Sequence, residues 1–105
     1  MKLLLVVFLF GLIGSCECSK ETYDQLVNFY NSTGGPNWFY TWKIDYDNYC
    51  EWYGIDCDDF GRVIYLQLPS NNLVGDIPYD FFEYFNDIEV VFLSQNYDLT
   101  GVISA

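Results

Sequence analysis

The chain has 105 residues and a formal net charge of −11, with 15 Asp and Glu against 4 Lys and Arg and with no His. Such an acidic chain repels nucleic acid, because binding there needs Lys and Arg to neutralise phosphates. Aromatic residues make up 21% of the sequence, which excludes intrinsic disorder because disordered chains are poor in aromatic residues. Length and composition predict one acidic folded domain that does not bind nucleic acid.

The first 18 residues have the layout of a secretory signal peptide. Lys2 precedes an almost unbroken apolar run from Leu3 to Ile13, and small and polar residues follow. The run is far shorter than the ~20 residues of a membrane-spanning helix, and it has no polar face that would suit a buried surface helix. We expect a signal peptide over residues 1–18 and a secreted chain without a membrane span. A lipid anchor on Cys16 is the alternative, and the cleavage site is open.

The segment from Ser19 to Asn31 predicts an amphipathic helix. Its apolar side chains follow the i, i+3, i+4, i+7 spacing of one helix face. They are Tyr23, Leu26, Val27 and Tyr30. Gly34, Gly35 and Pro36 then end the helix. Asn31 begins an N-glycosylation sequon, Asn-Ser-Thr, at the expected helix end.

An aromatic, irregular segment runs from Trp38 to Cys57 and contains all three tryptophans. Packing in a small core is the favoured interpretation of these rings, and a sugar-binding platform is the alternative. The stretch CEWYGIDC, from Cys50 to Cys57, fits a redox centre, half of a metal site or a structural bridge on local spacing alone.

After Gly61 the sequence repeats itself. Val63, Leu66, Leu68 and Asn71 recur 25 residues later as Ile88, Val91, Leu93 and Asn96. Leu73, Gly75 and Ile77 recur after 26 residues as Leu99, Gly101 and Ile103. A fixed period in this range indicates a solenoid. The pattern L-x-x-L-x-L-x-x-N-x-L predicts one short strand per repeat, with the asparagine turned inward to satisfy backbone groups at the bend.

These repeats resemble those of plant-type leucine-rich repeat proteins, which continue after the asparagine as L-x-G-x-I-P. Residues 73–78 match this tail fully, and residues 99–103 match it up to Ser104, where proline is expected. The region before the repeats is similar to the N-terminal cap of that family, with Tyr30 to Trp38, Trp42 and C-x-W-x-G-I-x-C. The resemblance implies an α/β solenoid, with a helical and aromatic cap over residues 19–61 and two leucine-rich repeat coils over residues 62–105.

In relatives with this cap the two cysteines form a disulfide, and the resemblance therefore implies a Cys50–Cys57 bridge. The acidic neighbours Glu51 and Asp56 agree with a structural bridge, because negative charge disfavours a reactive thiolate. Many relatives carry a double cysteine at the first position, where this chain has Tyr49 and Cys50, so their additional bridge is not implied.

The resemblance implies a secreted module that binds a protein or peptide without catalysis. In this architecture the side chains between the core leucines point outward on the concave sheet. The candidate partner-binding residues are Tyr65, Gln67, Pro69, Ser70, Val90, Phe92, Ser94 and Gln95. Two alternatives stay open: the N-terminal fragment of a longer leucine-rich repeat receptor, and a small secreted enzyme inhibitor.

The second repeat has no C-terminal cap within this sequence. Repeats bury their faces against neighbours, and an unpaired strand around Val90 to Leu93 favours edge pairing. We therefore expect edge-to-edge self-association through this repeat as a further mode of binding.

Catalytic and metal sites are not expected. Without His the chain lacks Ser-His-Asp and Cys-His arrangements and any His-containing zinc site. The acidic run Asp56, Asp58 and Asp59 lacks the D-x-[DN]-x-[DN]-G spacing of a calcium loop. We expect no enzyme activity and no cofactor.

Overall fold

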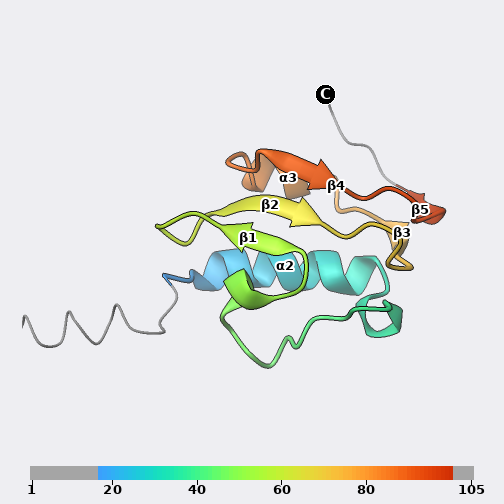
Figure 1. Ribbon diagram of the computed structural model, residues 1–105, viewed down its shortest axis with the longest axis horizontal. Coiled ribbons are helices and arrows are strands. Elements are labelled where there is room, and N and C mark those ends of the chain that lie inside the picture. The colour runs from blue at the N-terminus through green and yellow to red at the C-terminus, as the bar shows by residue number, and fades with distance from the viewer. Residues whose placement is uncertain (1–16, 101–105) are drawn as a thin grey trace, which may run out of the picture.

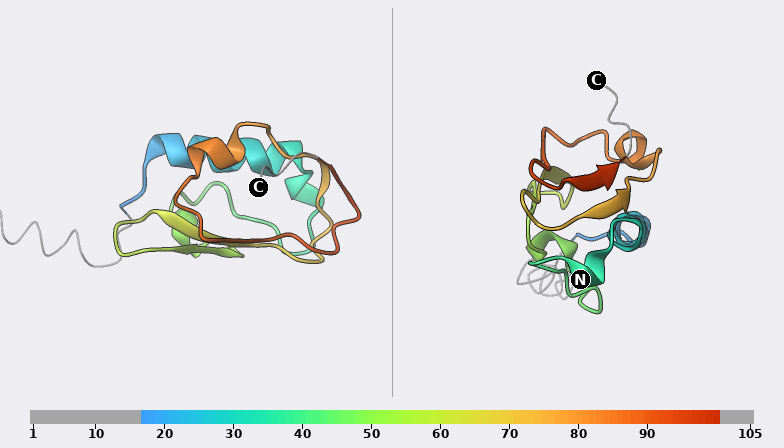
Figure 2. Two further views of the ribbon diagram at one scale, coloured as in Figure 1. Left: turned by 90° about the horizontal axis from the view of Figure 1, so that it is seen from above. Right: turned by 90° about the vertical axis from the view of Figure 1, so that its right-hand side faces the viewer.

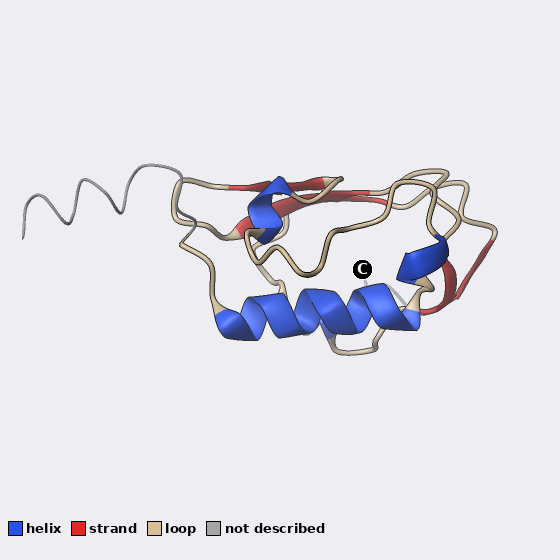
Figure 3. Ribbon diagram, turned by 90° about the horizontal axis from the view of Figure 1, so that it is seen from below, coloured by secondary structure: helices blue, strands red, loops and turns tan. Residues whose placement is uncertain are grey.

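The computed structural model describes residues 17–100. Most of the expected signal peptide, the alternative lipid site Cys16 and the end of the second repeat lie outside the described residues. Figures 1 and 2 show two layers, with helices α2 (Lys20–Ser32) and α3 (Phe81–Tyr84) on one side and a three-stranded sheet on the other. Figure 3 shows the same arrangement from below, with α2 running along the sheet.

Helix α2 begins where the sequence predicts. The Ser19 Oγ accepts a hydrogen bond from the backbone N–H of Thr22 at 3.0 Å, which makes Ser19 the N-cap. The helix buries Leu26, Phe29 and Tyr30 against the core. Phe29 is fully buried although the predicted stripe does not include it, because the apolar face of this helix is wider than four positions.

The helix ends at the predicted glycines. Gly34 adopts a left-handed backbone with φ of 74°. The chain continues into a 3-10 turn, η1 (Gly35–Asn37), with Pro36 in its first positions. Asn31 is exposed in the last turn of α2.

The tryptophans pack in the core, as the favoured interpretation predicts. Trp42 stacks on Trp52 with ring centroids 5.0 Å apart and on Tyr30 at 5.8 Å, and Trp38 meets it edge-on at 4.9 Å. All three tryptophans are buried. The cluster joins the irregular aromatic segment to α2, and it excludes these indole rings from a sugar-binding platform.

The main sheet has the order β1-β2-β4. A second 3-10 turn, η2 (Tyr49–Glu51), leads into β1 (Ile55–Cys57), which pairs antiparallel with β2 (Val63–Gln67). Strand β2 pairs in parallel with β4 (Val90–Phe92), and Leu66 lies opposite Val91. This offset is the 25-residue period of the sequence.

A second, two-stranded sheet joins β3 (Val74–Asp76) and β5 (Asp98–Thr100) in parallel. Gly75 lies opposite Leu99, an offset of 24 residues, whereas the sequence match pairs Gly75 with Gly101. The backbone register is therefore displaced by two residues from the sequence match. A displacement of two keeps every side chain on its own face, because side chains alternate with a period of two along a strand.

Candidate interaction surface

The outward face of the main sheet carries four of the candidate partner-binding residues. Along β2 the fully buried Leu66 alternates with Tyr65 and Gln67, which are half-buried and lie on the opposite face. Strand pairing places Tyr65 beside Val90 and Gln67 beside Phe92. Val90 and Phe92 are 44% and 48% exposed. The structure therefore brings these four side chains together in two rows.

The other four candidates do not lie on the sheet. Strand β2 ends at Gln67 and β4 ends at Phe92, so Pro69, Ser70, Ser94 and Gln95 lie in the turns that follow. Ser70 and Gln95 have φ of 51° and 61°, a left-handed conformation that is incompatible with an extended strand. The expectation that these residues continue the sheet face was wrong, and their part in partner binding stays a prediction.

These two turns lie side by side. The Ser70 backbone N–H donates to the Ser94 carbonyl at 2.9 Å, and the Ser70 hydroxyl donates to Gln95 Oε1 at 2.6 Å. The parallel pairing of β2 with β4 thus continues through the turns, and it aligns the first repeat with the second beyond the sheet.

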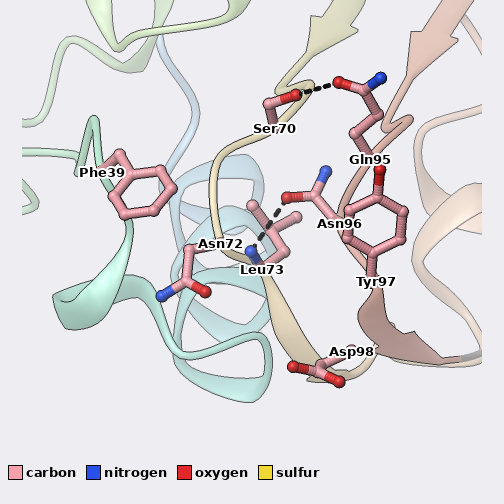
Figure 4. A pocket seen from close by; sticks show the side chains of 8 residues that line it. All are labelled: Phe39, Ser70, Asn72, Leu73, Gln95, Asn96, Tyr97 and Asp98. Atoms are coloured by element: carbon pink, nitrogen blue, oxygen red, sulfur yellow. Dashed lines mark hydrogen bonds between the residues drawn. The ribbon is translucent and has the colours of Figure 1, made fainter.

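A hollow of about 330 Å³ opens beside the two turns. Figure 4 shows the aromatic rings of Phe39 and Tyr97 at opposite sides of it, with amide side chains between them. The rings come from the segment after η1 and from the turn before β5, and they are 71% and 88% exposed. Its lining residues are Phe39, Ser70, Asn72, Leu73, Gln95, Asn96, Tyr97 and Asp98.

Of the residues that line this hollow, the sequence analysis predicts only Ser70 and Gln95 as candidate binding residues. Phe39 belongs to the aromatic segment that was assigned to the core, and its neighbour Trp38 is indeed buried. Tyr97 and Asp98 lie between the inward asparagine and the next leucine, where the repeat pattern leaves positions unspecified. The aromatic Tyr97 at such an unspecified position is the sequence feature that could have indicated a binding residue.

Asn96 forms part of the floor but is engaged by the backbone. Its Oδ1 accepts hydrogen bonds from the N–H groups of Asn71 and Leu73 at 2.9 and 3.0 Å. Its Nδ2 donates to the carbonyls of Leu68 and Leu93 at 2.8 and 2.9 Å. Asn96 therefore shapes the hollow, and a ligand would meet the other polar side chains.

Two of the chain's four cationic side chains form ion pairs far from the hollow. Lys20 Nζ lies 2.9 Å from Asp24 Oδ1, and Arg62 Nε lies 2.8 Å from Asp58 Oδ2. The residues that line the hollow include Asp98 and no Lys or Arg. The lining therefore carries one formal negative charge and no positive charge.

The disulfide implied by the family resemblance is present between Cys50 and Cys57. It joins the turn η2 to the end of β1, directly beside the buried Trp52.

Across residues 17–100, no group of three or more His, Cys, Asp or Glu side chains is arranged to hold a metal ion. Within the same range, every helix is too short or too polar to cross a membrane.

Comparisons with known proteins agree with the sequence motifs. No protein-family model matches the chain. The chain is 34% identical over 76 residues to the leucine-rich repeat receptor protein kinase EMS1 of Arabidopsis thaliana. This alignment covers 71% of this chain and 6% of that protein. It is 40% identical over 40 residues to a probable LRR receptor-like serine/threonine-protein kinase of the same plant, covering 38% of this chain and 5% of that protein.

A solved structure shows the same fold. The crystal structure of a leucine-rich repeat protein from Bacteroides eggerthii superposes with a TM-score of 0.60 at 23% identity, covering 66% of this chain and 12% of that chain. The chain thus spans a small part of each of these three proteins. Its fold is of the leucine-rich repeat type, and its sequence resembles that of plant-type leucine-rich repeat proteins.

Proposed function

We propose that the chain is a secreted binding module that recognises a protein or peptide and has no catalytic role. Similarity to leucine-rich repeat proteins supports a protein-interaction module. The observation that carries the proposal is the sheet face on which Val90 and Phe92 are nearly half exposed beside Tyr65. Apolar side chains that gather on an exposed face favour a binding surface, and aromatic residues are enriched in the energetic centres of interfaces.

The size of the face limits what it recognises. A standard protein interface buries ~800 Å² on each partner, which is demanding for a sheet of three short strands. An extended peptide laid across the strands needs less area, because it meets the two rows one side chain at a time. A peptide, or an extended segment of a protein, is therefore the partner that this face suits best.

The division of the chain supports the same proposal. We place a signal peptide over residues 1–18, a cap over residues 19–61 and two repeats over residues 62–105. The aromatic cluster around Trp42 and the bridge at Cys57 both precede β2, which agrees with a cap that ends before the first repeat.

The fragment of a longer receptor remains the second candidate, because the matched receptor kinases are far longer than this chain. A secreted enzyme inhibitor remains the third candidate.

Selection of phage-displayed random peptides on the immobilised chain tests binding directly. Selected peptides should lose at least about tenfold in affinity for Phe92→Asp, because a buried charge is costly at an apolar contact. The matched control is Tyr79→Ala, which removes a ring that is 89% exposed and lies outside the sheet. Peptides that bind the wild type and the Phe92→Asp variant equally would contradict the proposed face.

Secretion and glycosylation have their own test. Expression of the full chain in eukaryotic secretory cells should release it into the medium with a glycan on Asn31, which is exposed at the end of α2. Glycosidase treatment should then increase its electrophoretic mobility, and Asn31→Gln should have the same effect. A full chain that stays inside the cells would contradict secretion.

A further inference from the structure

We propose that the hollow between Phe39 and Tyr97 is a subsite for an arginine side chain of the partner. This inference rests on the proposed function, and it names the chemistry of one recognised residue. Figure 4 shows the two rings at opposite sides of the hollow, with Asn72, Leu73 and Asn96 between them and Asp98 at one end. A planar cationic group that enters the hollow can pack on the exposed face of one ring and reach the carboxylate.

The rings supply the first part of the argument. Phe39 and Tyr97 are 71% and 88% exposed, so neither ring is needed to fill the core. An exposed ring at the edge of a hollow can hold a planar guanidinium on its face, because the face of an aromatic ring attracts a cation. The hydrogen bond from the Phe39 N–H to the Asn71 carbonyl, at 3.4 Å, ties the first ring to the repeat.

The polar groups supply the second part. Asn72 Nδ2 donates to the Asn37 carbonyl at 3.0 Å, which fixes the orientation of its amide and leaves Oδ1 to accept from a ligand. Figure 4 shows this oxygen on the side of the hollow. Gln95 Oε1 accepts a hydrogen bond from the Ser70 hydroxyl. With the Asp98 carboxylate, the hollow offers oxygen acceptors, which suit a group that carries several N–H donors.

The charge distribution decides the sign of the ligand. The hollow is lined by Asp98 without a Lys or Arg, and the chain carries a net charge of −11. Lys20 and Arg62 are already paired with Asp24 and Asp58. A guanidinium fits better than an ammonium, because it stacks on rings and donates in a planar fork.

The backbone around the hollow agrees with a functional role. Ser70, Asn72 and Gln95 all have φ between 51° and 61°, a left-handed conformation that is uncommon for residues other than glycine. Such residues gather at binding sites, where the surrounding structure holds them in place. All three residues line the hollow.

A titration of the isotope-labelled chain, followed by NMR of the backbone amides, tests the subsite. The probes are the capped tripeptides Gly-Arg-Gly and Gly-citrulline-Gly, which have nearly the same shape and differ in charge. We expect saturable shifts at Asn72, Tyr97 and Asp98 with the arginine peptide, and at least about fivefold weaker binding of the citrulline peptide. Raising the NaCl concentration from ~0.05 to ~0.5 M should weaken arginine binding, because salt screens exposed charges.

Two variants and a matched control locate the effect. Asp98→Asn and Tyr97→Ala should each weaken binding of the arginine peptide at least about fivefold. Tyr79→Ala should leave it unchanged, since Tyr79 is an equally exposed tyrosine followed by an acid, Asp80, outside the hollow. The dispersion of the amide spectrum shows whether each variant is folded, and the citrulline and salt comparisons use the wild type alone.

Several results would overturn the subsite. Equal binding of the citrulline peptide, shifts confined to other residues, or binding of a neutral trisaccharide such as cellotriose in place of arginine would each do so. The two proposals can fail separately: if selected peptides contact the sheet face and carry no arginine requirement, the binding module stands and the arginine subsite is wrong. If the arginine peptide binds in the hollow and no selected peptide contacts the sheet face, the subsite stands and the sheet face is wrong as the binding surface.

Discussion

Asn96 holds the backbone of Asn71. The Oδ1 atom of Asn96 accepts the Asn71 N–H at 2.9 Å, and Asn71 in turn accepts the N–H of Tyr40 at 2.7 Å and donates to the Tyr40 carbonyl at 3.1 Å. Each inward asparagine therefore fixes the turn that precedes it, first in the cap and then in the first repeat. The two side chains connect the cap, the first repeat and the second repeat through one set of hydrogen bonds.

Replacing Asn71 with alanine should therefore be strongly destabilising. Asn71 is fully buried, and its removal leaves the N–H and carbonyl of Tyr40 without their partner. We expect a loss of about 2–3 kcal/mol in the free energy of unfolding, measured by urea denaturation with tryptophan fluorescence. Asn28→Ala, at an exposed position of α2, should change it by less than about 0.5 kcal/mol. Equal losses in the two variants would refute the role of Asn71.

The Cys50–Cys57 bridge should contribute to thermal stability. It closes a short loop between η2 and β1, and on the loop-entropy model such a bridge contributes about 2–3 kcal/mol to the free energy of unfolding. The double variant Cys50→Ser/Cys57→Ser should melt several degrees lower than the wild type in a calorimetric scan. The double variant avoids a leftover thiol. A melting temperature equal to that of the wild type would show that the bridge is dispensable.

The sequence predicts the repeat strands and the inward asparagines because the repeat pattern is dictated by packing. Leu66, Leu68 and Asn71 all have to fill or satisfy the interior, and the structure buries all three. The sequence does not predict which aromatic residues of the cap are exposed. Trp38 is buried while Phe39 is exposed, since an irregular segment has no periodicity that assigns side chains to a face.

The sequence does not predict the hollow either, for a different reason. It depends on the left-handed turns at Ser70 and Gln95, and neither Ser nor Gln has the preference for this conformation that Gly or Asn has. It also depends on Phe39 and Tyr97 lining the same hollow, although these residues are far apart in the sequence. Local patterns carry little information about either feature.

Gly54 should not tolerate a side chain. Its φ is 82°, and a Cβ added there would collide with the carbonyl oxygen of Gln67, whose N–H donates to the Gly54 carbonyl at 2.8 Å. Gly54→Ala should therefore disrupt the pairing of β1 with β2 and lower the midpoint of urea unfolding. Gly34→Ala is the milder comparison, because its added Cβ meets the side chain of Val74 and not backbone. A smaller effect at Gly54 than at Gly34 would contradict this account.

The turn before β2 should make stability depend on pH through Asp58. Its Oδ1 accepts the N–H groups of Arg62 and Phe60 at 3.0 and 2.9 Å, and its Oδ2 accepts from Arg62 Nε. The backbone hydrogen bond from Arg62, with the bond from Phe60 and the guanidinium of Arg62, holds the pKa of Asp58 below its ordinary value. These interactions favour the charged form in the folded state.

A lowered pKa in the folded state stabilises the protein above the unfolded pKa of ~3.9. This contribution is lost as the pH falls through the lower, folded pKa, because the unfolded state then binds more protons. Asp58→Asn keeps an oxygen acceptor in the turn and removes the charge, so its stability should decline less steeply below about pH 4. Urea midpoints measured across this acidic range should show the difference, and Asp59→Asn, at the exposed neighbouring position, is the control. If the acid limbs of the wild type and Asp58→Asn are parallel, the carboxylate of Asp58 does not stabilise the folded turn.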